Sequence, residues 1–171
     1  DDGLIHLTKD GGNTWENVTP KKMPDWMMIN SIDASSFDSG TAYIAGTRYK
    51  LGDFTPYLYV TDDYGKNWKL ITDGIKDEHF TRVLRSDKVN KNILYAGTET
   101  GMYISYDRGN SWNEFQKNLP IVPITDLTIK DNSLIVATQG RSIWMIDDLT
   151  VFHQLTPSTD QIKLYKPKDS Y

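Results

Sequence analysis

The stretch Thr61-Asp62-Asp63-Tyr64-Gly65-Lys66-Asn67-Trp68 follows the pattern Ser or Thr, any residue, Asp, any residue, Gly, any two residues, Trp. The same pattern recurs at Thr8–Trp15 and at Ser105–Trp112. With ordinary residue frequencies, one match is expected by chance on the order of once per thousand chains of this length. Three matches therefore indicate an internal repeat, and we call each of them a box.

A fourth, decayed copy of the box lies at Met145–Phe152. Asp147 holds the position of the box aspartate and Phe152 that of the tryptophan, while Leu149 stands in place of the glycine. The box aspartates at positions 10, 63, 107 and 147 are separated by 53, 44 and 40 residues. Because four-stranded propeller blades repeat about every 40–45 residues, two of the three spacings indicate such blades.

Short runs rich in β-branched and aromatic residues lie between the boxes and predict strands, since turn residues bound each run. No segment shows sustained helical periodicity. The predicted strands are Ile29–Ala34, Ala42–Gly46, Tyr57–Thr61 and Trp68–Thr72 in one unit, Thr81–Arg85, Ile93–Thr98, Met102–Ser105 and Trp112–Phe115 in the next, and Ile124–Ile129, Leu134–Thr138, Ile143–Ile146 and Phe152–Leu155 in the third. The sequence therefore predicts an all-β fold of β-propeller blades with four antiparallel strands each.

The units divide the chain into about three and a half blades. A half blade, beginning with a strand at Gly3–Thr8, covers residues 1–19, and full blades cover residues 20–73, 74–118 and 119–157. Propellers close with typically 4–8 blades. We therefore expect residues 1–157 to belong to a larger propeller, completed by the remainder of the same protein or by another chain. In the alternative, Ile162–Tyr165 returns to complete the half blade and closes a four-bladed ring.

Each box has the composition of a tight turn between the third and fourth strands of its unit. The aspartate can accept backbone N–H groups, as in an Asx-turn, and the glycine can take a positive φ without a Cβ clash. The tryptophan opens the fourth strand and is expected to pack between neighbouring units. We expect structural rather than catalytic or metal-binding roles for the box residues, which are Asp10, Gly12, Trp15, Asp63, Gly65, Trp68, Asp107, Gly109, Trp112 and the decayed Asp147.

The composition excludes several classes of partner. The net charge is −4 and the 19 Lys and Arg residues are scattered, whereas nucleic-acid-binding proteins usually carry a basic stripe. No apolar run approaches the roughly 20 residues that span a bilayer. The chain has no cysteine, and His6, His79 and His153 lack metal-ligand spacing. We therefore predict no metal, no cofactor, no nucleic-acid partner and no membrane span.

The boxes resemble the Asp-box, or bacterial neuraminidase repeat. This repeat occurs in sialidases, some endo-acting β-glucan hydrolases, sortilin-type receptor ectodomains and photosystem assembly factors. The resemblance implies a β-propeller with the boxes on the hairpins between third and fourth strands.

The stretch Ala137–Leu149 also resembles the closing blade of large secreted bacterial proteins of the sortilin-like or glycosyl-hydrolase-like kind. Gln139 and Ser142 stand where that pattern has His and Gly, which weakens the case for a site in this loop but leaves the fold unaffected. The resemblance implies a bacterial protein that is secreted, periplasmic or at the cell surface. Residues 158–171 then resemble a linker toward a following domain.

An inserted loop is the first candidate binding site. Thr47 lies 14 positions before the box at Thr61, whereas the equivalent Thr98 lies 7 positions before Ser105, so the insertion lies within Arg48–Pro56. Inserted loops on a repeat scaffold often bind ligands. The aromatic residues that this loop can offer to a sugar or a peptide are Tyr49, Phe54 and Tyr57. In the alternative, the loop packs on the neighbouring blade.

Two further residues are candidates for ligand binding. Trp26 precedes an innermost strand and can overhang the central channel, or belong to the core together with Met27 and Met28. Arg141 follows Gly140 in the closing-blade stretch and can bind a carboxylate, or hold the adjacent loop.

Catalysis finds little support in the sequence. Sialidase chemistry needs a cluster of arginines, and the five arginines of this chain occupy unmatched positions in their units. Glycoside hydrolysis needs two carboxylates about 5–10 Å apart, and Asp33 and Asp126, on or beside predicted innermost strands, are weak candidates. We therefore expect a non-catalytic binding or scaffolding propeller that recognises a protein, a peptide or a glycan. A glycoside hydrolase of the Asp-box type and a sortilin-like peptide receptor are the alternatives.

Overall fold

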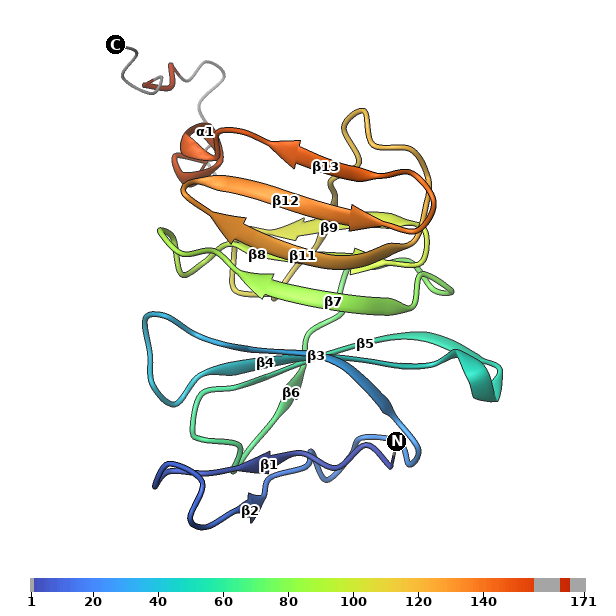
Figure 1. Cartoon of the computed structure of the whole chain (residues 1–171), viewed down its shortest axis with the longest axis vertical. Coiled ribbons are helices and arrows are strands. Elements are labelled where there is room, and N and C mark those ends of the chain that lie inside the picture. Colours follow the sequence, from blue (N-terminus) through green and yellow to red (C-terminus); the bar gives the residue numbers. More distant parts are fainter. Residues whose placement is uncertain (1, 156–163, 167–171) are drawn as a thin grey trace.

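The computed structural model describes residues 2–155 and 164–166, and most of its regular structure is β-strand. Within these residues the strands form four antiparallel sheets, which follow one another along the long axis of the molecule (Figure 1). The first sheet contains β1 (His6–Leu7) and β2 (Glu16–Asn17); the second β3 (Met28–Ala34), β4 (Ala42–Arg48), β5 (Asp53–Thr61) and β6 (Lys69–Leu70); the third β7 (Thr81–Ser86), β8 (Leu94–Thr98), β9 (Gly101–Ser105) and β10 (Asn113–Glu114); and the fourth β11 (Ile124–Lys130), β12 (Ser133–Thr138) and β13 (Ile143–Ile146). The predicted all-β propeller fold is confirmed.

In every sheet the strands lie side by side in chain order, as the blades of a propeller do. The first strand of each larger sheet contacts the first strand of the next, so that β7 lies between β3 and β11. All three of these innermost strands shift register near their start, between Ile29 and Ser31, Thr81 and Val83, and Ile124 and Asp126. Because a bulge bends and twists its strand, the shared position gives the three sheets the same shape.

The box between β5 and β6 shows why the pattern needs its polar residues. Thr61 Oγ1 accepts the backbone N–H of Gly65 at 2.9 Å and donates to Asp63 Oδ1 at 2.9 Å. The Asp63 carboxylate accepts the backbone N–H of Asn67 at 2.9 Å, which holds the pKa of Asp63 below its usual range. The boxes at Thr8 and Ser105 repeat these bonds. The carboxylates are thus engaged by their own turns.

Two of the three box tryptophans form a hydrogen bond to the sheet before their own. Trp68 Nε1 donates to the carbonyl of Val18 at 2.7 Å, and Trp112 Nε1 donates to the carbonyl of Ile71 at 2.7 Å. Trp112 is only 4% exposed. Trp15, in the first sheet, bonds to the carbonyl of Gly12 in its own box and is 60% exposed.

The glycine of the third box is required by packing as well as by conformation. Gly109 has a φ of +84°, in the region that favours glycine. A Cβ at this position would lie 2.6 Å from Ile71 Cδ1 of the preceding sheet. Likewise, a Cβ added at Gly65 would lie 2.6 Å from Val18 Cβ. The turn therefore approaches the neighbouring sheet too closely for any other residue.

Three apolar cores fill the spaces between successive sheets. The core between the second and third sheets contains Tyr43 and Leu58 on one side and Leu84 and Tyr103 on the other, with Trp112 among them. Similar clusters lie between the first and second sheets and between the third and fourth. Each sheet is thus stabilised mainly by its two neighbours, as in repeat architectures, and a partial propeller implies completion by other parts of the protein or by other chains.

The predicted strand Phe152–Leu155 is wrong. The chain there forms the one-turn helix α1 (Thr150–His153), so the fourth sheet has three strands among the described residues. Leu149, which replaces the box glycine, is fully buried, and Asp148 accepts the backbone N–H of Thr150 at 2.9 Å, which starts the helical turn. Phe152 nevertheless packs edge-on against Phe115 of the third sheet, with ring centroids 5.2 Å apart. The decayed box keeps the aromatic contact and loses the strand.

The described part of the C-terminal segment lies beside α1. The side chain of Gln154 accepts the backbone N–H of Lys166 at 2.9 Å and donates to its carbonyl at 2.8 Å. This end of the arc is opposite to β1 and β2 (Figure 1), so Leu164 and Tyr165 do not complete the half blade as the alternative of a four-bladed ring required. Ile162 and Lys163, the other residues of that alternative, lie outside the described residues. The rest of the predicted linker at 158–171, and the blade boundary at 157, lie outside the described residues. Within residues 2–155 and 164–166, no helix has the length and apolarity needed to cross a membrane.

We predict that Trp112→Ala lowers the free energy of unfolding by about 3–5 kcal/mol, because it removes a buried aromatic side chain and leaves the carbonyl of Ile71 without its indole donor. Trp15→Ala is the matched control and is expected to cost less than about 1 kcal/mol, as exposed positions do. Urea unfolding of both variants measures the difference. Equal losses would contradict the role given to the box tryptophans.

Candidate ligand-binding site

One side of the arc carries the turns β4–β5, β8–β9 and β12–β13, and we call it the hairpin face. The boxes lie on the opposite side (Figure 1). The segments that enter β3, β7 and β11 reach the hairpin face as well, because strands of a sheet alternate in direction. Trp26, the Tyr49–Phe54 stretch and Arg141 all belong to segments of this face.

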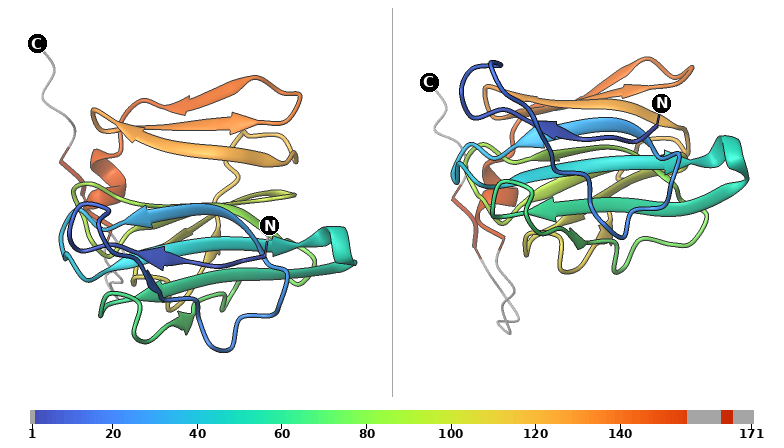
Figure 2. Two further views of the ribbon diagram at one scale, coloured as in Figure 1. Left: turned by 60° about the horizontal axis from the view of Figure 1, so that its bottom comes forward. Right: turned by 90° about the horizontal axis from the view of Figure 1, so that it is seen from below.

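The inserted segment is an ordered extension of the β4–β5 hairpin. A 3₁₀ turn, η1 (Tyr49–Leu51), is closed by Gly52 at a φ of +75°, and Arg48 pairs with Asp53 across the hairpin. The Arg48 guanidinium donates to the Asp53 carboxylate at 2.7 Å and the Tyr57 hydroxyl donates to the same oxygen at 2.8 Å. Figure 2 shows the hairpin projecting beyond the other turns of its side.

The hydrogen bonds at Asp53 hold its carboxylate in the charged state. Burial acts to raise the pKa of Asp53, but the bonds from Thr55, Tyr57 and Arg48 outweigh it and bring the pKa below its usual range. Tyr57 is itself buried, and its backbone N–H donates to Thr81 Oγ1 at 2.9 Å. Its ring supports the hairpin from within the sheet.

The outer part of the hairpin packs on the entrance to β7. The Tyr49 ring stacks on Phe80 with centroids 5.2 Å apart and planes at 10°, and Phe54 meets Phe80 at 5.9 Å. The guanidinium of Arg82 lies over both Tyr49 and Phe80, at 5.7 and 5.3 Å from the centroids. Phe54 remains 47% exposed. The hairpin is therefore fixed to the next sheet while part of its aromatic surface faces outward.

A cavity of about 190 Å³ lies between this hairpin and the segment before β3. It brings Trp26 and Tyr49, two of the predicted binding residues, together; its lining comprises Trp26, Met28, Thr47, Arg48, Tyr49, Lys50 and Leu51. Trp26 is 68% exposed and has a φ of +60°, whereas its neighbour Met27 is fully buried. A bulky residue in this backbone region is an outlier that marks a turn or a functional site.

The lining residue Thr47 differs from its equivalents in the other sheets. Thr98 donates to the carbonyl of Gly101 at 2.9 Å, and Thr138 donates to the carbonyl of Ser142 at 2.6 Å. The insertion moves the corresponding carbonyl away from Thr47, and its buried hydroxyl has no hydrogen-bond partner among the described residues. Buried Arg48 Nε has none either. Unsatisfied buried groups are costly, so two such atoms beside one cavity are unusual.

The comparison with protein families places this chain among known proteins. The model of the Sortilin-Vps10 family, described as sortilin, neurotensin receptor 3, matches residues 56–168, about two thirds of the chain. The chain belongs to the Sortilin-Vps10 family. No curated protein gives a significant match to the sequence.

Solved structures similar to this Sortilin-Vps10 chain are also propellers. The structure of YCF48 bound to D1 peptide superposes with a TM-score of 0.62 at 21% identity, covering 85% of this chain and 46% of that one. The GH74 xyloglucanase from Xanthomonas campestris gives a TM-score of 0.62 at 16% identity, covering 84% and 24%. The GH74 enzyme of Niastella koreensis gives 0.55 at 12%, covering 70% and 21%. The chain thus spans less than half of each of these proteins.

Arg141 lies apart from the cavity in this Sortilin-Vps10 chain, on the β12–β13 turn of the fourth sheet. The turn contains Gly140 and Ser142 at φ values of +83° and +63°, and the carbonyl of Arg141 accepts Trp144 Nε1 at 2.7 Å. Its side chain is exposed. The third sheet separates it from Trp26 and Tyr49.

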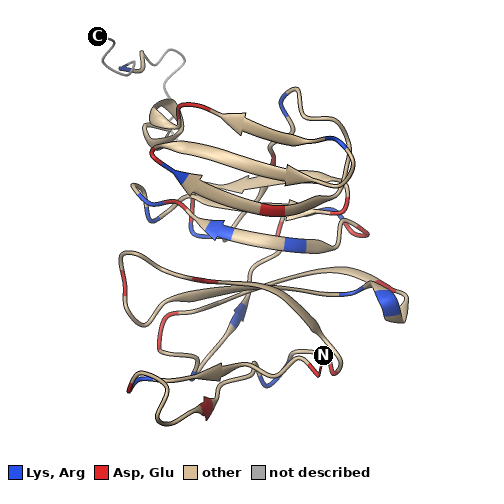
Figure 3. Cartoon of the chain, in the orientation of Figure 1, with Lys and Arg blue, Asp and Glu red and all other residues tan. Residues whose placement is uncertain are grey.

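The two weak catalytic candidates tie neighbouring inner strands together. Asp33 on β3 accepts the backbone N–H and the hydroxyl of Ser86 at 2.8 and 2.6 Å. Asp126 on β11 accepts Arg85 Nη2 at 2.8 Å; Figure 3 shows an acidic position on β11 beside the basic positions of β7. Because β7 lies between their strands, the structure does not bring the two carboxyls together.

A metal site would need a cluster of ligand side chains among the described residues. Within the described residues no three His, Asp or Glu side chains cluster as they would around a metal ion. Positive and negative residues are interspersed over the sheets (Figure 3). Sequence reasoning missed the cavity residues Met28, Thr47 and Leu51, and also Phe80. Alignment of the repeats could have revealed Thr47, since a threonine stands at or next to the end of the second strand in all three units.

We predict that Asp53→Asn loosens the hairpin at neutral pH. The variant weakens the bonds from Arg48 and Tyr57, so the amide of Gly52, bonded to the Tyr49 carbonyl at 3.0 Å, exchanges its hydrogen faster. Because the folded pKa is lowered, the stabilisation by Asp53 is full above the ordinary aspartate pKa and is lost as the pH falls through the folded value. Hydrogen exchange at two pH values tests this, and a difference that persists in strong acid would contradict it.

Proposed function

We propose that this chain forms part of a non-catalytic binding propeller that recognises a peptide segment at its hairpin face. The observation that carries the proposal is the cavity between Trp26 and Tyr49. An exposed tryptophan in a left-handed backbone conformation costs free energy twice, through its backbone and through its apolar exposure. A residue with such a cost is retained in a protein when its side chain contributes to binding.

The lining of the cavity favours a peptide side chain over a sugar. Trp26, Met28, Tyr49 and Leu51 offer mostly apolar contact, and Thr47 Oγ1 and Arg48 Nε are covered. The Arg48 guanidinium is bonded to Asp53, and Lys50 is the exposed basic residue of the lining. A hexose carries a hydroxyl on most of its carbons, and each hydroxyl that loses water without a new partner costs free energy. An apolar side chain needs no such partners. The peptide-bound structure of YCF48, a propeller of similar fold, supports the same class of ligand.

Family membership supports a binding role for the parent protein. Membership of the Sortilin-Vps10 family supports a binding or scaffolding role, and we propose that the parent is an exported bacterial protein. Hydrolysis of a glycan would require a pair of carboxyls near a bound sugar, and Asp33 and Asp126 are instead bonded to β7. A glycan ligand and a hydrolytic activity are therefore the alternative outcomes of the tests below.

We predict that Trp26→Ala weakens peptide binding about ten-fold or more, because exposed aromatic anchors dominate such interfaces. The intact chain is screened against an immobilised library of eight-residue peptides, and fluorescence anisotropy of the peptides that bind gives the Kd for each variant. Tyr49→Ala is expected to act in the same direction. Phe37→Ala is the matched control, since Phe37 is 41% exposed in the β3–β4 loop on the opposite side.

A second measurement addresses catalysis directly. The intact chain is incubated with xyloglucan and other β-glucans, and the release of reducing sugar is measured. We expect no turnover. Hydrolysis that disappears in Asp33→Ala or Asp126→Ala would replace the binding function by that of a glycoside hydrolase, and peptide binding that is insensitive to Trp26→Ala and Tyr49→Ala would move the site elsewhere.

A further inference from the structure

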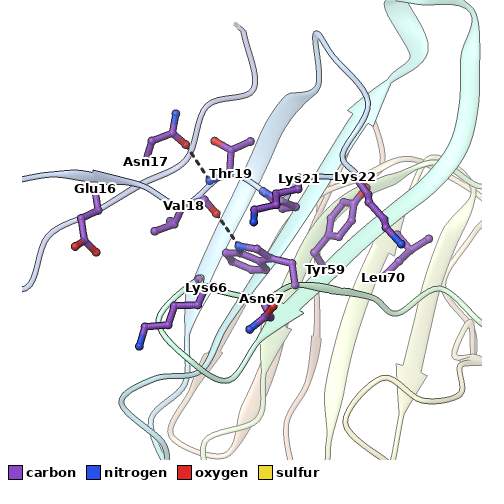
Figure 4. A pocket seen from close by; sticks show the side chains of 13 residues that line it. Glu16, Asn17, Val18, Thr19, Lys21, Lys22, Tyr59, Lys66, Asn67 and Leu70 are labelled. Atoms are coloured by element: carbon purple, nitrogen blue, oxygen red, sulfur yellow. Dashed lines mark hydrogen bonds between the residues drawn. The ribbon is translucent and has the colours of Figure 1, made fainter.

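A larger cleft lies at the outer edge of the arc, between the first and second sheets. Its volume is about 770 Å³, and it is lined by residues 16–22 of the first unit and by Tyr59, Gly65, Lys66, Asn67, Trp68 and Leu70 of the second. Figure 4 shows the side chains around it, with the indole that bonds to the Val18 carbonyl between them. We call it the rim cleft. It is separate from the Trp26–Tyr49 cavity, with which it shares no lining residue.

At the other two interfaces an apolar residue fills the position that is open beside Trp68. Ile75 and Leu119 are 7% and 9% exposed, and each donates its backbone N–H to a residue three positions earlier, Thr72 and Gln116. Ile75 lies four residues after the buried Ile71, and Leu119 lies four residues after the buried Phe115. Both buried residues directly follow the outermost strand of their sheet. A smaller cleft of about 340 Å³ remains between the second and third sheets, lined in part by Lys76, Tyr103 and Glu114 but not by Trp112. Between the third and fourth sheets the cavity around residues 115–119 measures only about 40 Å³.

The first unit has one residue more at this place. Val18 corresponds to Ile71 and Phe115, since all three donate a backbone N–H to the preceding strand region. Met23 makes the same three-residue turn, to Pro20, but follows Val18 by five residues. It is only partly buried. The extra residue carries Lys21 and Lys22 outward and leaves the space beside Trp68 open, whereas Trp112 in the next interface is buried.

The surface of the rim cleft combines an apolar floor with basic edges. Trp68, whose N–H is satisfied by Val18, presents its ring, and Leu70 is 47% exposed beside it. Lys21, Lys22 and Lys66 line the cleft, and no ion pair formed within residues 2–155 and 164–166 uses any of them.

One acidic residue lies among the lining residues, and its charge is balanced outside the cleft. Glu16 forms an ion pair with Lys9 at 3.1 Å. The cleft therefore carries a local excess of positive charge although the chain is acidic overall. A complementary ligand has negative charges on either side of a large apolar group, since the charges steer and orient it and the apolar group covers the partly exposed indole of Trp68.

We propose that the rim cleft binds an acidic peptide segment of another protein, with one aromatic or large aliphatic side chain seated on Trp68. The short strands β2 and β6 border the cleft and leave backbone groups available to an extended segment, the mode of recognition that uses sheet edges. The three lysines select acidic residues on either side of the seated side chain. This site is independent of the function proposed for the hairpin face.

The test uses the intact chain and a fluorescein-labelled peptide of sequence Glu-Asp-Glu-Phe-Glu-Asp-Glu. Saturable binding is expected in fluorescence anisotropy, weakening with added salt. The double variant Lys21→Glu with Lys22→Glu is expected to bind about ten-fold or more weakly, because two attractions become repulsions. Deletion of Lys21 restores the four-residue spacing of the other units and is expected to weaken binding by at least as much, because Met23 then closes the cleft.

Three controls make the result decisive. Lys117→Glu reverses an exposed lysine on the corresponding loop of the third unit, where the cleft is closed, and is expected to leave the Kd unchanged. The same peptide with Ala in place of Phe is expected to bind at least about ten-fold more weakly. Circular dichroism confirms that each variant folds. Absence of saturable binding, or equal affinity for the double variant and the wild-type chain, would overturn the proposal.

Discussion

The indoles of Trp68 and Trp112 each reach across to a backbone carbonyl of the preceding sheet, and the stacking of the sheets depends on this contact. Buried inside the interface, the N–H of Trp112 needs an acceptor, and the carbonyl of Ile71 supplies it at 2.7 Å. The approach is possible because Gly109 has no side chain to meet Ile71. The Ser105 and Asp107 hydrogen bonds hold the turn in the required shape. The eight residues of this box thus specify both their own turn and its contact with the neighbouring sheet.

Because the same interface is built repeatedly, departures from the repeat become informative. The insertion after Thr47 leaves a hydroxyl without the carbonyl that Thr98 and Thr138 use, and it brings Tyr49 toward Trp26 at one cavity. The additional residue before Met23 opens the rim cleft beside Trp68. Both departures lie in loops, while the innermost strands β3, β7 and β11 keep a common bulge. This is the division expected of a rigid repeat scaffold with variable connections.

The innermost strands use their charged side chains for cohesion. Asp33 accepts two hydrogen bonds from Ser86, and Arg85 binds both Asp126 and the carbonyl of Leu127. Charge-assisted hydrogen bonds of this kind are stronger than neutral ones. The contacts join β3 to β7 and β7 to β11 where no backbone ladder connects them. Asp33 and Asp126 are therefore occupied in holding neighbouring sheets together.

The sequence by itself determined the boxes, the strand order within each unit and the all-β propeller fold, because hydrogen bonds between residues two to four positions apart and a repeat of 40 to 53 residues encode them. It also identified Trp26 and Tyr49 singly as candidates. Only the tertiary structure decided that these two share a cavity and that Thr47 and Trp68 border open space. It also showed that the expected strand Phe152–Leu155 is absent and that a one-turn helix at Thr150–His153 overlaps its start. Those features arise where segments far apart in the chain meet, and how closely two such segments pack is fixed by the side chains between them, which no local pattern records.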